Sequence, residues 1–151
     1  MTRFKKIISL VLLVLLFIVY FIYSRPTTIR GILGLSKDFI STDNYIHITK
    51  WNQSKPDVNN INLSAEEFKE IIENFDGFKV RRTFSKYYHS SSTGEFYFID
   101  FEYSLNDDGN KSFRITSDGI IKVNGKSYKL IEDEDAWVGM IQKIYNTTLD
   151  F

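Results

Sequence analysis

A long apolar run near the N-terminus restricts the architecture of this chain more than any other sequence feature. The run extends from Ile7 to Tyr23, and Ser9 is the small polar residue within it. As a helix it would be about 25 Å long, close to the roughly 30 Å thickness of a bilayer's hydrocarbon core. Tyr20 and Tyr23 suit the membrane interface, where amphipathic rings are favoured. The sequence therefore predicts a transmembrane anchor over residues 7–23, in contact with the lipid bilayer.

A cleaved signal peptide is the alternative interpretation of the same run. The apolar part of a signal peptide is usually about 7 to 15 residues long and is followed by small residues. Here the run ends in large aromatic residues, followed by the small Ser24 and then by Arg25. We predict a retained signal-anchor, with cleavage after Ser24 as the alternative.

The basic residues around the run predict its orientation. A flank over residues 1–6 carries Arg3, Lys5 and Lys6, whereas Arg25 is the first cation on the other side. Cytoplasmic flanks of membrane helices are enriched in Lys and Arg. The sequence predicts a single-pass cell-membrane protein with a cytoplasmic N-terminus and an extracytoplasmic domain. Because the charge difference is small, the reverse topology is the alternative.

The residues behind the run have the composition of one small soluble domain, and they exclude several function classes. Three of the 19 basic residues precede the run, whereas all 19 acidic residues follow it, so the domain is slightly acidic. This balance disfavours nucleic acid as a partner. The chain has no Cys, which excludes disulfides, thiol nucleophiles and cysteine-based metal or iron–sulfur sites. No cofactor is predicted.

The boundary between tether and domain is predicted from turn-forming residues. Residues 24–44 carry Pro26, Gly31 and Gly34 between short apolar groups, a pattern typical of loops. We therefore expect a juxtamembrane stalk over residues 24–44 and the globular domain over residues 45–151.

The first part of the domain is predicted to contain a strand, a loop and a helix. Residues 45–51 alternate between apolar and polar side chains, whereas residues 55–62 are mostly polar. Ser64 and Glu67 have the spacing of a capping box, which starts a helix by satisfying its first amide groups. The apolar residues that follow at helical spacing are Phe68, Ile71, Ile72 and Phe75. This stripe predicts a helix that packs on the sheet.

The second part of the domain is predicted to be an antiparallel meander. Its strands are expected over residues 79–84, 95–105, 113–116, 120–123 and from 126 onward. A three-residue loop with a left-handed Gly119 would pair Ile115 with Ile121, and a two-residue Asn124-Gly125 turn would pair Ile121 with Tyr128. This register places the apolar side chains of three strands on one face, whereas a two-residue turn at Gly119 would split them.

A second helix is predicted after the meander. Asp133-Glu134-Asp135 places negative charge at the positive end of a helix dipole. Trp137, Ile141, Ile144 and Tyr145 follow at helical spacing. The predicted fold class is α+β: an antiparallel β-meander sheet with two helices packed on one face, preceded by a single N-terminal transmembrane helix.

Patterns that indicate catalysis or metal binding are weak in this sequence. His47 and His89 are the two imidazoles, and they lie far apart without a metal-ligand spacing. Asp100 and Glu102 share one face of a predicted strand about 6.8 Å apart, as alternation in any strand would place them. The hydroxyl-rich run after His89 lacks a nucleophile-elbow pattern. We therefore predict no enzymatic activity and no metal site.

Basic and aromatic residues instead indicate a binding surface. Tyr and Arg are enriched at the energetic hot spots of protein interfaces. The binding site predicted on this basis comprises Arg81, Arg82, Tyr87 and Tyr88. Phe96 and Phe98 share a strand face with Asp100 and Glu102, so they either extend this surface or pack under the second helix.

The leading function hypothesis is a non-enzymatic binding or interaction module with an unidentified protein partner. The alternative is a toxin or bacteriocin immunity protein, which needs the same tether and a compact protein-binding domain. A cell-envelope hydrolase is third, and paired carboxylates beside His47 or His89 in a pocket would support it. In format the chain resembles the small single-span extracytoplasmic proteins of low-GC Gram-positive bacteria, and its helix-then-meander order resembles cystatin-like α+β folds in topology.

Overall fold

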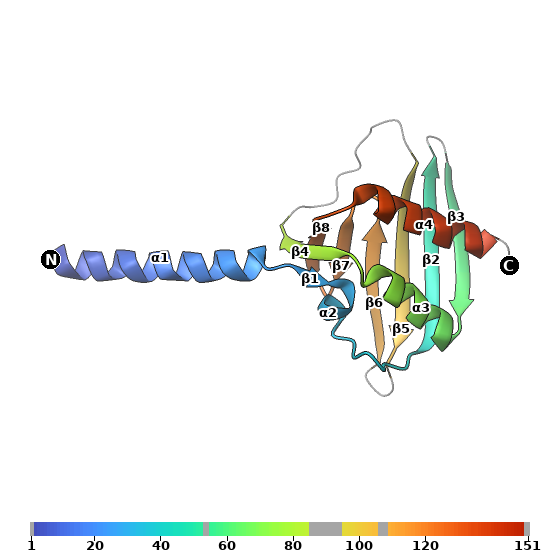
Figure 1. The fold of residues 1–151 in the computed structure, drawn as a ribbon, viewed down its shortest axis with the longest axis horizontal. Coiled ribbons are helices and arrows are strands. Elements are labelled where there is room, and N and C mark those ends of the chain that lie inside the picture. Colours follow the sequence, from blue (N-terminus) through green and yellow to red (C-terminus); the bar gives the residue numbers. More distant parts are fainter. Residues whose placement is uncertain (1, 53–54, 85–94, 106–108, 150–151) are drawn as a thin grey trace.

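The computed structural model describes residues 2–52, 55–84, 95–105 and 109–149, and within them the chain forms four helices and eight strands (Figure 1). The helices are α1 (Thr2–Ser24), α2 (Ile29–Leu33), α3 (Ala65–Phe75) and α4 (Glu134–Leu149). The strands are β1 (Thr27–Thr28), β2 (Thr42–Asn52), β3 (Lys55–Leu63), β4 (Lys79–Thr83), β5 (Phe96–Ser104), β6 (Asn110–Thr116), β7 (Ile120–Val123) and β8 (Lys126–Leu130). The predicted α+β class is confirmed.

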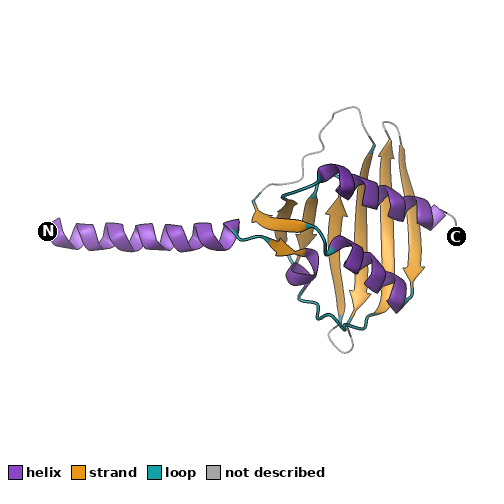
Figure 2. Cartoon of the chain, in the orientation of Figure 1, coloured by secondary structure: helices purple, strands orange, loops and turns teal. Residues whose placement is uncertain are grey.

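All described strands belong to one antiparallel sheet, in the order β1-β4-β8-β7-β6-β5-β2-β3. The strands from β5 to β8 follow one another as a meander, and β2 and β4 attach at its two sides. Helices α3 and α4 cross the same face of the sheet (Figure 2). We call this the helix face and the opposite one the open face.

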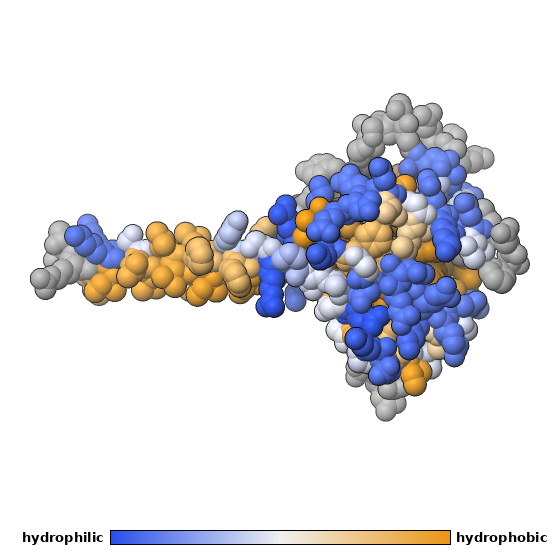
Figure 3. Space-filling model, in the orientation of Figure 1, coloured by the Kyte–Doolittle hydropathy of each residue, from blue (hydrophilic) through white to orange (hydrophobic). Residues whose placement is uncertain are grey.

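Helix α1 extends away from the domain as an apolar rod (Figure 3). It contains the candidate membrane span of the described residues, Phe4–Ser24, and none of that span is buried in the domain. Its length and composition are those of a helix that can cross a bilayer.

Helix α3 begins at the predicted capping box. The Ser64 hydroxyl accepts a hydrogen bond from the Glu67 amide at 3.2 Å, and the Glu67 carboxylate accepts one from the Ser64 amide at 2.7 Å. These bonds hold the pKa of Glu67 below its usual value. The predicted stripe faces the core through Phe68, Ile72 and Phe75, all fully buried, whereas Ile71 at its edge is half-buried.

Helix α4 is the predicted second helix, and it packs on the sheet through Trp137, Ile141 and Tyr145. The Asp133 carboxylate accepts a hydrogen bond from the Ala136 amide at 3.1 Å, which caps the helix start. The indole N–H of Trp137 donates to the Thr116 carbonyl at 2.8 Å, so this fully buried ring has its polar group satisfied.

The predicted hairpin register is confirmed. Ile115 pairs with Ile121, and Ile121 with Tyr128. Gly119 has a φ of 77°, in the left-handed region, as the three-residue loop requires. Asn124 and Gly125 also have positive φ angles, of 49° and 71°, which is the geometry of a two-residue hairpin turn.

Residues 24–44, predicted as a stalk, are instead incorporated into the domain. Ile29, Leu33 and Phe39 are buried in the core, and β1 pairs with β4. The Arg30 guanidinium lies 3.4 Å from the Asp76 carboxylate, which ties α2 to the end of α3. The correction has a simple cause: the apolar groups are too short to show a periodicity, yet each has a place in the core.

Residues 55–62, predicted as a polar loop, form most of the edge strand β3. It pairs with β2 along its whole length, from Asn44 opposite Leu63 to Asn52 opposite Lys55. Pro56 is tolerated because an edge strand does not need every amide as a donor. The polar composition reflects the position of β3 at the edge of the sheet, where one side is open to water.

A cluster of polar and aromatic groups connects the second half of α4 to the sheet. The Tyr145 hydroxyl donates to the Asp57 carboxylate at 2.5 Å, and this bond raises the pKa of Tyr145 to about 12. The Lys50 ammonium lies 2.6 Å from the Glu95 carboxylate. The same ammonium lies over the rings of Tyr97 and Tyr145, in the geometry of a cation–π contact. The hydrogen bond from Lys50 lowers the pKa of Glu95.

Candidate functional site

The open face carries a broad depression of about 830 Å³ over β2, β3, β5, β6 and β7. Strand alternation explains its chemistry: near the middle of these strands the apolar residues point to the helix face, and the polar residues between them point the other way. Pairing then aligns these polar residues across the sheet. One cross-strand line consists of Asn60, His47, Asp100, Arg114 and Lys122, each opposite the next. We call these five residues the polar row.

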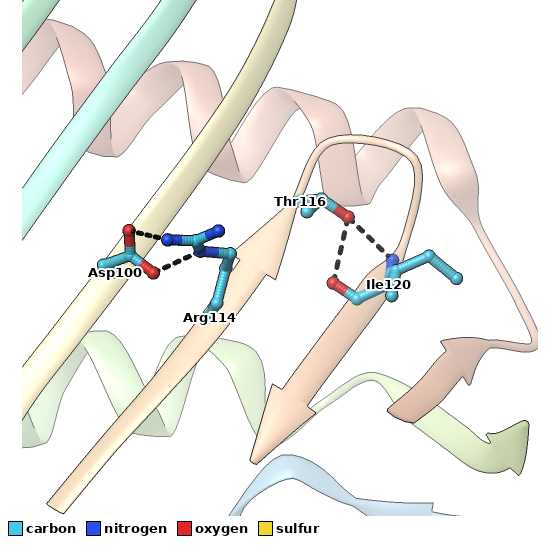
Figure 4. A network of polar contacts seen from close by, with 4 residues as sticks. All are labelled: Asp100, Arg114, Thr116 and Ile120. Carbon is cyan, nitrogen blue, oxygen red and sulfur yellow. Dashed lines mark hydrogen bonds and ion pairs between the residues drawn. The ribbon is translucent and has the colours of Figure 1, made fainter. Parts of the chain in front are cut away.

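An ion pair forms the centre of the polar row (Figure 4). The Arg114 guanidinium donates through two nitrogens to the two oxygens of Asp100, with Nη2 2.7 Å from Oδ2 and Nε bonded to Oδ1. The same guanidinium lies over the Phe98 ring, 5.4 Å from its centroid. Asp100 is therefore held by a planar, two-point contact with both oxygens engaged.

His47 is fixed at the β3 side of the row. Its Nδ1 is hydrogen-bonded to the Asn60 side-chain oxygen, which can only accept, so Nδ1 carries the proton. In a neutral ring this leaves Nε2 as an acceptor. The row thus places an oriented imidazole directly opposite the Asp100 carboxylate on the neighbouring strand.

Lys122 gives the other end of the row a second cation beside Arg114. Partial burial and the nearby guanidinium both lower the pKa of Lys122. Glu102 lies one step along β5, opposite Tyr45 and Ser112. The depression therefore carries both signs of charge side by side, a pattern that suits a partner with alternating polar groups.

An aromatic surface adjoins the polar row on the open face. Trp51 is 42% exposed and lies 6.4 Å from Phe98 between ring centroids, and Phe98 lies 6.0 Å from Phe96. Tyr45, at the other side of the row, is 50% exposed. Phe96 and Phe98 therefore do not pack under α4, since they lie on the opposite face of the sheet.

Of the predicted binding residues, the two that the structure describes, Arg81 and Arg82, do not line this depression. Arg81 is exposed on β4, opposite Lys129, and β4 is separated from β7 by β8. Arg82 stacks over the Tyr23 ring, with its guanidinium carbon 4.6 Å from the centroid. Tyr87, Tyr88 and His89 lie outside the described residues.

Sequence reasoning identified part of the open-face site. Asp100, Glu102, Phe96 and Phe98 were expected to share one face because they alternate along a single strand. His47 was singled out as an imidazole but not placed beside them, and Asn60, Arg114 and Lys122 were not singled out. All four lie on other strands. Such residues can be found from the sequence only when the strand order is known. The pattern to look for is then a polar residue at alternate positions of each neighbouring strand.

A second depression, of about 490 Å³, lies between α3, α4 and β3. Ile71, Met140 and Ile144 line it, and Gly139 leaves open space beside it. Figure 3 shows this strip as a less polar surface between the polar surfaces of the two helices. In the described part of the chain, no three His, Asp or Glu side chains are grouped as metal ligands.

The chain matches no protein-family model, no curated protein and no solved structure.

Proposed function

We propose that the chain is a membrane-anchored binding protein whose extracytoplasmic domain recognises a protein partner with the open face. The observation that carries this proposal is the depression in which the polar row lies between exposed Tyr45 and Trp51. Tyr, Trp and Arg are the side chains most enriched at binding hot spots.

The ion pair and the exposed rings of the open face contribute little to the stability of the fold. The Arg114 side chain is 44% exposed, and an ion pair so open to solvent typically adds about 1 kcal/mol or less to folding. Two large rings left partly in water add less to stability than rings in the core. Oriented charges beside exposed rings do suit the polar, aromatic-rich surface of a recognition site.

The proposal includes a retained anchor with its N-terminus in the cytoplasm. Arg3, Lys5 and Lys6 favour this orientation of the span. Protease added to intact protoplasts is then expected to digest the domain without lysis. A domain that survives until lysis would reverse the topology, and a mature N-terminus at Arg25 in mass spectrometry would remove the anchor.

Capture of the partner tests the open face. Cross-linking and pull-down with the full chain in its own membrane should identify the partner. Tyr45→Ala and Trp51→Ala should then each weaken capture of that partner by roughly 30-fold. This factor corresponds to the loss of about 2 kcal/mol expected at a binding hot spot. The matched control is Glu70→Ala, an exposed residue of α3 on the helix face. It should leave capture unchanged.

Two outcomes contradict this assignment. If Arg81→Ala weakens capture and the open-face variants do not, the binding surface lies on β4, where the sequence hypothesis placed it. If Tyr45→Ala unfolds the domain, the ring is structural. Immunity is the special case in which the captured partner is a toxin, and loss of the protein would then raise susceptibility to it.

Hydrolysis of envelope polymers is the second candidate function, favoured by one specific observation. His47 lies opposite Asp100, and Glu102 lines the same depression, so two carboxylates and an imidazole converge. Because Arg114 engages both Asp100 oxygens, Glu102 is the carboxylate placed to exchange a proton. Release of soluble fragments from purified envelopes should then be lost in both Glu102→Gln and His47→Ala. The absence of release by the unaltered protein would reject this function.

A further inference from the structure

The domain touches the end of its own anchor through one aromatic contact. The rings of Tyr23, in the last turn of α1, and Phe84, directly after β4, are stacked with centroids 4.6 Å apart. On β4 the Arg82 guanidinium covers the same Tyr23 ring at 4.6 Å. Despite this stacking, 80% of Phe84 is exposed.

The position of Tyr23 in the span fixes the depth of these groups. The candidate span contains 21 residues, so as a helix it is about 31 Å long and matches the hydrocarbon core. Tyr23 then lies at the boundary of the hydrocarbon on the domain side. The headgroup layer beyond it is roughly 5 to 8 Å thick. Groups within 4.6 Å of the Tyr23 ring therefore lie in this layer.

The residues around Phe84 have the chemistry of a lipid headgroup contact. Lys126 is exposed, and it is next to Phe84 in the register because Ser127 pairs with Thr83. Arg81 and Lys129 are also exposed and opposite each other, but alternation places them on the other face of the sheet at this edge. The nearby Glu132 is paired with Lys79 at 3.9 Å. An exposed ring among cations matches the membrane interface, where rings take the boundary and cations meet the phosphates.

We propose that the domain is seated on the bilayer surface, with Phe84 in the interface and Arg82 and the neighbouring cations on phospholipid headgroups. This seat rests on the proposed retention of α1 as an anchor. It holds the β1–β4 side of the sheet against the membrane. The depression on the open face covers the strands from β7 to β3. These strands lie on the side of the sheet away from β1 and β4, so in this arrangement they lie farther from the membrane.

Single-cysteine probes test the seat cleanly, because the chain has no Cys. The full-length protein is reconstituted into vesicles of phosphatidylcholine and phosphatidylglycerol with a headgroup spin label as quencher. An environment-sensitive fluorophore on Phe84→Cys should show blue-shifted emission and lose most of its fluorescence to the quencher. The matched control is Tyr45→Cys on β2, five strands and about 24 Å from β4. It should emit as in water and keep its fluorescence.

A second probe is needed because Phe84→Cys removes the ring that is proposed to lie in the membrane interface. Lys126→Cys leaves Phe84, Arg82 and Tyr23 unchanged and should also be quenched. Adding Arg82→Gln should reduce that quenching. If neither probe is quenched more than the control at Tyr45, the domain is not seated on the membrane. Flotation with the vesicles and the intact mass show separately that the anchor is retained, so failure of the seat is distinct from failure of the anchor.

Discussion

Trp137→Ala is expected to lower the free energy of unfolding by about 3 to 5 kcal/mol, the range for emptying a buried aromatic site. The Trp137 ring is fully buried. It packs on Phe75 and Phe78 with ring centroids 5.1 and 5.2 Å apart, so it joins α4 to α3 and to the segment after it. Its loss also leaves the Thr116 carbonyl without the indole donor.

Chemical denaturation of the full chain in detergent measures this loss, with Trp51→Ala as the control. Trp51 has the same side chain but is 42% exposed on the open face, so its removal should cost far less. Trp137→Phe should recover much of the packing and still lack the hydrogen bond. Equal denaturation midpoints for Trp137→Ala and the unaltered chain would mean that α4 does not depend on this ring.

Gly119→Ala is expected to destabilise the domain by about 2 to 5 kcal/mol, because two separate costs add. The φ of 77° at Gly119 is strained for any residue with a Cβ. A Cβ there would also lie 2.8 Å from the Leu130 Cβ, within the core side of β8. Since the Gly119 carbonyl accepts from the Leu130 amide at 2.8 Å, the loop cannot move away without losing that bond.

Gly125→Ala is the matched control for the second cost. Gly125 has nearly the same φ, 71°, and nothing lies within 4 Å of the Cβ position. It should therefore cost only the left-handed strain, about 1 to 2 kcal/mol. If denaturation gives the same loss for both variants, the contact with Leu130 is not a close one.

The predictable parts of the fold are those specified by neighbouring residues. The Ser64 and Glu67 pair locates the start of α3 because both bonds of a capping box are local. Gly119 and Asn124-Gly125 determine the meander register because a hairpin loop of known length leaves few pairings, and one of them keeps the apolar side chains together.

The unpredicted parts depend on contacts between distant segments. The burial of Ile29 and Leu33 is decided by a core that other elements complete. In the same way, the polar row depends on β2 pairing with β5 across more than a third of the chain, which no local turn specifies. The sequence therefore predicted only part of the candidate site. Asp100 and Glu102 were recognised as neighbours, whereas His47 and Arg114 could not be placed beside them.

The connection between anchor and domain has a mechanical consequence. If the proposed anchor and partner are both present, a pull on the partner would reach the bilayer through β1 and α2. β1 pairs with β4 at two positions, and α2 is held by its buried side chains and by Arg30. Apart from the contacts of the Tyr23 ring with Phe84 and Arg82, this short segment carries the load. Its strand β1 has fewer paired positions than any other described strand. Under tension it should detach first and leave the other strands joined. Residues 25–41, which precede β2, would then extend to about 56 Å. The segment would act as an extensible tether that releases force before the proposed binding surface is disturbed.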